Sequence, residues 1–296
     1  MSLAEKFKTE LPKYEGFTFM QYFDRCSSQG CWHNGAYLQC TSRFRDCLPS
    51  YDGLDPEKHE DESAIIVVAK LFNLHKPVRF VSSRVVEKGR RNKPIELICE
   101  NGESYTAYAK KMKIPQNYQR SLVGLELTRL LRGGIPFMYT REYQITAFAG
   151  TDLEDLPAKS YLDSGFAFRL GIDEAFREIT ALEDVRPANH CYDGARIITV
   201  DLETVLHVFN SVMDSQEVEL YQGLHLLDED EFRSGMEAGR KLILSNIDQN
   251  IVDFAKLISV ITRDNLDLQF SFKNRGNQEE LSYSDYVLEL IKKWSV

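Results

Sequence analysis

The chain has 296 residues, of which 43% are hydrophobic, which suits one large globular domain or two modest ones. The formal net charge of −9 argues against a nonspecific nucleic-acid binder, because such proteins neutralise phosphates with clustered Lys and Arg. No apolar run approaches the roughly 20 residues that cross a bilayer, and the first residues lack the apolar segment of a signal peptide. We therefore expect a cytoplasmic protein without a membrane span.

The first sixty or so residues are rich in aromatic side chains and predict irregular structure. Four cysteines and a histidine lie within residues 26–47, and the gaps between the cysteines are four, eight and six residues. Structural zinc sites usually have pairs with about two to four intervening residues, so this spacing favours small buried side chains, with zinc as the alternative. A polar segment at residues 50–63 marks a boundary. Residues 1–75 thus form an amino-terminal extension whose role the sequence leaves open.

From Val78 onward the pattern predicts a β-meander followed by a helix. Three strand-like segments are joined by the basic turn "KGRRNKP" and by the dipeptide Asn101-Gly102, which is a strong hairpin signal. The apolar periodicity of residues 117–133 then predicts an amphipathic helix that is closed by Gly133 and Gly134. Strand character returns after this helix. Residues 76–150 therefore predict a β-rich lobe with one helix.

The rest of the chain, residues 151–296, predicts a mainly helical lobe. Five segments have helical periodicity, namely residues 171–184, 202–215, 228–247, 250–262 and 283–296. The main interruption is a β-pair around Asn189 and Asp201. Together the two parts predict an α+β fold with a small β-rich lobe and a helical lobe.

Three oxygen-bearing side chains surround this β-pair in the segment "EDVRPANHCYDGARIITVDLETVLH", residues 183–207. Asp184 precedes Asn189 by five residues, and Asp201 follows a β-branched run. Carboxylate and amide oxygens are ligands that Mg²⁺ accepts. A phosphotransferase needs such groups in this order: a loop Asp at the acceptor hydroxyl, then an Asn and a second Asp for the metal. In the alternative interpretation, Asp184 caps a turn and Asp201 caps the following helix.

A phosphotransferase of this kind also needs a strand lysine for the α- and β-phosphates. Lys110 and Lys111 are adjacent, and a strand directs them to opposite faces. The residue two positions before the functional lysine lies against adenine and should be small. Because Ala109 precedes Lys111 in this way, whereas bulky Tyr108 precedes Lys110, we select Lys111.

These segments resemble atypical kinases. Residues 183–206 are similar to the catalytic and metal-binding segment of the phosphoinositide-kinase-like group, of HipA-like kinases and of the kinase-like dehydratase domain of class II lanthipeptide synthetases. Residues 84–111, "RVVEKGRRNKPIELICENGESYTAYAKK", resemble the amino-terminal lobe of HipA-like kinases. The resemblance implies a two-lobed protein-kinase-like fold and an ATP- and Mg²⁺-dependent phosphotransferase. Its first expected acceptor is a Ser or Thr of a protein substrate.

The resemblance implies a role for each matching residue. Asp184 would orient or deprotonate the acceptor hydroxyl, whereas Asn189 and Asp201 would hold Mg²⁺. Lys111 would bind the α- and β-phosphates. Glu126, the acidic residue of the helix at 117–133, would pair with this lysine, although it stands about one turn later than in the family.

The remaining expected contacts are those of the nucleotide. The family's glycine-rich loop is reduced to Gly89, so Arg90 and its basic neighbours would bind phosphates by charge. Backbone groups near Phe148 and Ala149, in "YQITAFAGTDLEDLP", would bind adenine. Two other functions remain open: a catalytically inactive binding module that keeps the fold, and an ATP-dependent transferase that is not a kinase.

Overall fold

The computed structural model describes residues 1–18, 21–22, 80–85, 92–99, 102–111, 115–133, 137–139, 143–147, 149–182, 187–200, 202, 227–263, 272–273 and 280–296. The chain divides into two units. One unit consists of Met1–Phe19, Gln119–Gly134 and Ala149–Val296, and the other of Met20–Tyr118 and Ile135–Phe148. Each unit is built from segments that are far apart in the sequence.

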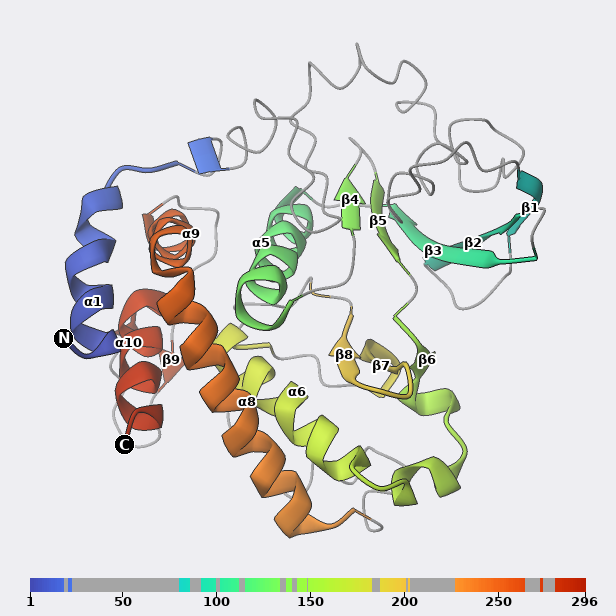
Figure 1. The fold of residues 1–296 in the computed structure, drawn as a ribbon. Coiled ribbons are helices and arrows are strands. Elements are labelled where there is room, and N and C mark those ends of the chain that lie inside the picture. Colours follow the sequence, from blue (N-terminus) through green and yellow to red (C-terminus); the bar gives the residue numbers. More distant parts are fainter. Residues whose placement is uncertain are drawn as a thin grey trace. The chain divides into compact units, whose positions relative to one another are not determined.

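A five-stranded antiparallel sheet belongs to the unit that contains Met20–Tyr118 (Figure 1). Its order is β1-β2-β3-β5-β4, with β1 at Phe80–Val85, β2 at Asn92–Cys99, β3 at Ser104–Lys111, β5 at Tyr143–Ala147 and β4 at Phe137–Tyr139. Gly102 in the turn before β3 has a φ of 82°, which glycine adopts without steric cost. The predicted series of three strands, a helix and further strands is confirmed.

Helix α5 (Pro115–Arg132) connects β3 to β4, and from Gln119 onward it belongs to the mainly helical unit. Its leucines and Val123 are buried, as the apolar periodicity predicted. Gly133 directly follows the last helical residue and has a φ of 68°. This left-handed conformation ends many helices, so the predicted glycine stop is confirmed.

The mainly helical unit also contains a small sheet. Its helices besides α5 are α1 (Leu3–Glu10), α6 (Phe166–Thr180), α8 (Glu229–Gln249), α9 (Ile251–Arg263) and α10 (Tyr283–Trp294). Its short 3₁₀ helices within the described residues are η1 (Leu11–Tyr14), η3 (Leu153–Asp155), η4 (Ala158–Leu162) and η5 (Pro187–Asn189). A three-stranded sheet has the order β6 (Thr151–Asp152), β7 (His190–Tyr192) and β8 (Ile197–Thr199), and β9 (Phe272–Lys273) pairs with β10 (Glu280–Leu281).

The fold is therefore a mixture of strands and helices in which helices predominate. The helices predicted at 171–184, 228–247, 250–262 and 283–296 are confirmed as α6, α8, α9 and α10. The helix predicted at 202–215 lies outside the described residues except for Leu202. Within the described ranges, no helix combines the length and the apolar character needed to cross a bilayer.

Helix α1 corrects the prediction of irregular structure for the first sixty residues. Ser2 and Glu5 form a reciprocal capping box, in which the Ser2 backbone N–H donates to the Glu5 carboxylate at 2.7 Å. Phe7 of α1 is buried, and its ring centroid lies 5.8 Å from that of Phe254 in α9. The beginning of the extension thus completes a helical core. The Ser-x-x-Glu pattern at Ser2 is the signal that predicts this helix.

The small sheet packs on α6 through an apolar cluster. The buried members of this cluster are Leu153, Tyr161, Phe166, Leu170 and Ile197. Tyr161 and Phe166 lie with ring centroids 5.0 Å apart, and the Tyr161 hydroxyl donates to the Leu153 carbonyl at 2.9 Å. The polar end of this tyrosine is therefore satisfied inside the cluster.

Glycines allow α6 and α8 to pack unusually closely. A Cβ atom on Gly235 of α8 would lie 2.0 Å from the carbonyl oxygen of Phe168 in α6. In the opposite direction, a Cβ atom on Gly171 would lie 2.2 Å from the carbonyl oxygen of Phe232. Because both obstacles are backbone atoms, no side-chain rearrangement relieves them. The two helices therefore have a fixed spacing, which holds α6 in place.

We expect Gly235→Ala to lower the free energy of unfolding by at least about 2 kcal/mol, because the added methyl group forces the two backbones apart. Urea denaturation measures this change. The matched control is Ser234→Ala at the neighbouring exposed position, which should stay within about 0.5 kcal/mol of the parent chain. Equal midpoints for the two variants would contradict the close packing.

Candidate functional site

The predicted β-pair is a short hairpin formed by β7 and β8. His190 is the pairing partner of Thr199 at its open end. At its closed end, the Asp193 carboxylate accepts hydrogen bonds from the backbone N–H groups of Ala195 and Arg196, both at 2.8 Å. This side-chain-stabilised turn fixes the register of the two strands. The hairpin therefore holds His190 and Thr199 side by side.

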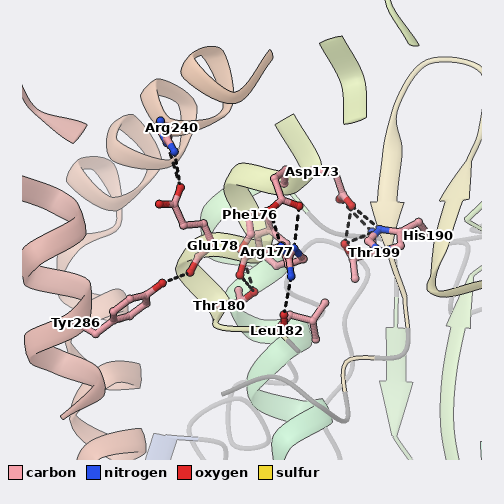
Figure 2. Close-up of polar contacts among 11 residues, drawn as sticks. Asp173, Phe176, Arg177, Glu178, Thr180, Leu182, His190, Thr199, Arg240 and Tyr286 are labelled. Carbon is pink, nitrogen blue, oxygen red and sulfur yellow. Dashed lines mark hydrogen bonds and ion pairs between the residues drawn. The ribbon is translucent and has the colours of Figure 1, made fainter. Parts of the chain in front are cut away.

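One buried carboxylate, that of Asp173 in α6, binds both strands of this hairpin (Figure 2). Its Oδ2 accepts a hydrogen bond from the Thr199 hydroxyl at 2.7 Å and lies 2.7 Å from Nδ1 of His190. Its Oδ1 accepts the backbone N–H of Thr199 at 3.2 Å. Because an ionised carboxylate only accepts hydrogen bonds, Nδ1 of His190 is the donor.

Arg132, the last residue of α5, completes the surroundings of Asp173. Its guanidinium group forms an ion pair with Oδ1 of Asp173 and donates to the Ile197 carbonyl of β8 at 2.5 Å. The guanidinium carbon also lies 5.1 Å from the ring centroid of Phe176. The end of α5 is thereby tied to both α6 and the hairpin.

The electrostatic balance keeps Asp173 ionised. Burial of this side chain, which is 1% exposed, by itself raises the pKa of the carboxyl group. The charge of Arg132 and the hydrogen bond from His190 outweigh this effect, so the pKa lies well below its ordinary value. Two oxygens thus receive four donors and leave the buried charge well compensated.

A second buried ion pair fixes the chain just before Asp184. After the end of α6, Ala181 has a φ of 49°, and the Leu182 N–H donates back to the Arg177 carbonyl at 3.3 Å. The Arg177 guanidinium donates to the Leu182 carbonyl at 3.4 Å and to the Glu174 carboxylate at 2.8 and 2.7 Å. This turn is a common way to end a helix. It fixes the backbone at Leu182.

Burial also governs the ionisation of Glu174. Loss of solvation raises the pKa of this carboxyl group, and the neighbouring charge of Arg177 opposes the rise. Both side chains are almost completely buried, with exposed fractions of 5% and 2%. Removal of either partner would leave the other charge without compensation in the interior of the unit.

Asn189 and Ala149 are two predicted site residues whose positions the structure gives. Asn189 is buried at the end of η5, and its carbonyl accepts the Val200 N–H at 2.7 Å. Ala149 is buried directly before Gly150, where a Cβ atom would lie 2.3 Å from the Tyr192 carbonyl oxygen. The following strand β6 pairs with β7 and contacts η5. Ala149, of the predicted adenine contacts, and Asn189 therefore lie at the same small sheet.

Lys111 and Glu126 are the other two predicted residues with described positions. Lys111 is the last residue of β3 and is the pairing partner of Tyr143 in β5. Glu126 is buried in α5, and its carboxylate forms an ion pair with Arg129, whose Nε donates at 2.8 Å. The two residues belong to different units, and their mutual pairing stays a prediction.

The other predicted positions lie outside the described residues. These are Asp184, Asp201, Gly89, Arg90 and Phe148, together with the cysteine segment at 26–47. In the part of the chain that is described, no three His, Cys, Asp or Glu side chains are grouped so that they could hold a metal ion.

Sequence reasoning missed the polar residues of α6. Glu174 and Arg177 have a readable signal, since their spacing of three residues brings them together on one helix face. Asp173 has none, because its partners His190 and Thr199 stand 17 and 26 residues away. Only the tertiary fold brings these three side chains together.

We expect Asp173→Asn to destabilise the protein by about 3–5 kcal/mol, because it leaves Arg132 buried without its counter-charge. The matched control is Asp248→Asn, whose exposed ion pair with Lys6 at 2.6 Å should contribute about 0–1 kcal/mol. Thermal unfolding of both variants measures the difference. A loss at Asp173 no larger than that at Asp248 would contradict the assigned role of the buried carboxylate.

Comparison with known proteins gives matches among solved structures alone: no family model and no curated protein matches the sequence. The chain is similar to three structures of CtTel1, namely the complete dimer with C2 symmetry (TM-score 0.42, 11% identity), the open conformation (0.40, 11%) and the FAT and kinase domain (0.39, 12%). Each match covers 93% of this chain, but 14%, 14% and 26% of those chains, respectively. The chain is thus weakly similar to part of a protein that has a kinase domain. At TM-scores under 0.5 this likeness carries no functional argument.

Proposed function

We propose that the chain is an ATP- and Mg²⁺-dependent phosphotransferase of the HipA-like or phosphoinositide-kinase-like type, with a Ser or Thr hydroxyl of a protein as its acceptor. The observation that carries the proposal is the hydrogen bond from the Val200 N–H to the Asn189 carbonyl. It joins one expected metal ligand to the residue that directly precedes the other, Asp201.

The donor set suits a magnesium–nucleotide site. Asp201 directly follows Val200, whose N–H donates to the Asn189 carbonyl, although eleven residues stand between Asn189 and Asp201 in the sequence. In nucleotide sites Mg²⁺ needs few ligands from the protein, because water molecules and phosphate oxygens occupy its other coordination positions. Asn189 and Asp201 would hold the ion. Bound Mg²⁺ would neutralise the charge that develops on the phosphates.

Asp184 is the proposed catalytic residue. It stands in a four-residue segment, 183–186, between Leu182 and Pro187. On either side of this segment, Leu182 is bound by Arg177 and Pro187 begins η5, which ends at Asn189. In the proposed role, its carboxylate accepts a hydrogen bond from the acceptor hydroxyl and orients it. It takes up the hydroxyl proton as the oxygen bonds to the γ-phosphorus and the bond from that phosphorus to the leaving ADP breaks.

The proposed nucleotide contacts are those that the resemblance to atypical kinases implies. Lys111 would bind the α- and β-phosphates, and Gly89 and Arg90 would contact phosphates from the turn before β2. Backbone groups of Phe148 and Ala149 would hydrogen-bond adenine. The rigid surroundings of Ala149 support this role, since Gly150 next to it is packed against the backbone of β7.

ADP formation from Mg-ATP in the presence of a generic protein acceptor tests the function. We expect Asp184→Asn to lower the rate by about 10²-fold or more, which is the usual contribution of a positioned acid or base. Asp201→Asn should also lower the rate, because it removes the charged ligand that would hold Mg²⁺. Asp248→Asn, at an exposed ion pair, should keep the parent rate.

Other outcomes of this assay would replace the proposal. Release of AMP instead of ADP would identify a transferase that is not a kinase. Binding of Mg-ATP without turnover would identify a binding module that keeps the fold. ADP formation that survives both substitutions would show that the catalytic centre lies elsewhere in the chain.

A further inference from the structure

The three polar groups at the open end of the hairpin form a tight triangle (Figure 2). Oδ2 of Asp173 lies 2.7 Å from the Thr199 hydroxyl oxygen and 2.7 Å from Nδ1 of His190. The Thr199 hydroxyl oxygen and Nδ1 of His190 are themselves 3.4 Å apart. All three residues are buried. The triangle therefore holds the two strands to α6 as well as to each other.

The position of this triangle relates directly to the proposed metal ligands. His190 is the neighbour of Asn189 in the chain, and Thr199 stands two residues before Asp201. A displacement of β7 relative to β8 would change the separation of the two ligands. Mg²⁺ demands near-ideal octahedral geometry, so it is sensitive to such a change.

We propose that the Thr199 hydroxyl, through its hydrogen bond to Asp173, sets the spacing of Asn189 and Asp201 and thereby the strength of Mg²⁺ binding. This inference rests on the proposed function and assigns Thr199 as a positioning residue. Groups that hold metal ligands from behind typically contribute about 10- to 100-fold to metal affinity. The hydroxyl can be removed without loss of volume, because valine has nearly the same shape as threonine.

A purely structural role of Thr199 makes a different prediction. The loss of a buried hydrogen bond costs about 0.5–1.5 kcal/mol of stability between neutral groups and about 1.5–3 kcal/mol when one group is charged, whether or not a metal site lies nearby. Thr128 in α5 provides the comparison, since its buried hydroxyl donates to the Gly124 carbonyl at 2.8 Å, away from the hairpin. Both Thr128→Val and Thr199→Val should lower stability, the second by more because its hydroxyl donates to a charged carboxylate, whereas only the second should affect Mg²⁺.

The test is the dissociation constant of ATP, measured by equilibrium dialysis once with Mg²⁺ and once with EDTA. The dissociation constant in EDTA divided by that with Mg²⁺ measures how many times the metal strengthens ATP binding, and we call this ratio the metal gain. We expect Thr199→Val to reduce this gain about tenfold and to leave metal-free ATP binding within about twofold. Thr199→Ser, which restores the hydroxyl, should recover the gain, and Thr128→Val should keep it. Thermal unfolding in EDTA verifies that each variant is folded.

Each outcome decides the inference. If Thr199→Val keeps the parent ratio of ATP dissociation constants, or if Thr199→Ser lowers this ratio as much as Thr199→Val does, the inference is overturned while the proposed function survives. A parent protein that binds no ATP, or binds it equally with and without Mg²⁺, overturns the proposed function and this inference together. If Thr199→Val does not fold, Thr199→Ala takes its place under the same criteria.

Discussion

The buried carboxylate of Asp173 is the interaction on which the arrangement of the mainly helical unit depends. An isolated charge in the interior costs several kcal/mol, so each of its four donors contributes to the stability of the fold. These donors come from three separate elements: Arg132 at the end of α5, His190 in β7 and Thr199 in β8. A single side chain therefore fixes the position of one helix end and both strands of the hairpin relative to α6.

Helix α6 uses further buried polar contacts along its length, because Arg177 and Glu178 also bind parts of the chain outside this helix (Figure 2). Toward its end, Arg177 holds the chain that leads to Asp184, while the Glu178 carboxylate accepts two hydrogen bonds from Arg240 of α8 at 3.1 and 2.7 Å. The Tyr286 hydroxyl of α10 donates to the Glu178 carbonyl at 2.6 Å. The helix is thus a common support for the hairpin, for the segment before Asn189 and for the packing of the helices around it. Such rigidity suits the proposed site, in which one ligand directly precedes β7 and the other follows β8 in the sequence, and the two must keep a constant separation.

The sequence predicted those features that depend on neighbouring residues. The five-stranded sheet followed from strand patterns and from glycine at the turn, and α5 followed from leucine periodicity and Gly133. Helix α1 was missed although its capping box is a local signal at Ser2. The contacts of Asp173 belong to another class, since they join residues that only the packing of α6 against the hairpin brings together. For the candidate site, the order of Asp184, Asn189 and Asp201 was readable, whereas the buried groups that support it were not.

The central claim is that Asn189 and Asp201 form part of a magnesium–nucleotide site. The most direct measurement is thermal unfolding of the purified protein with and without Mg-ATP, beside the variant Asp201→Ala. A ligand at about 100 times its dissociation constant adds roughly 2.7 kcal/mol to the native state, a shift of several degrees in a cooperative transition. The account predicts that the parent protein shifts when ATP and Mg²⁺ are both present and that Asp201→Ala does not. Equal unfolding temperatures for the parent protein with and without Mg-ATP would contradict it.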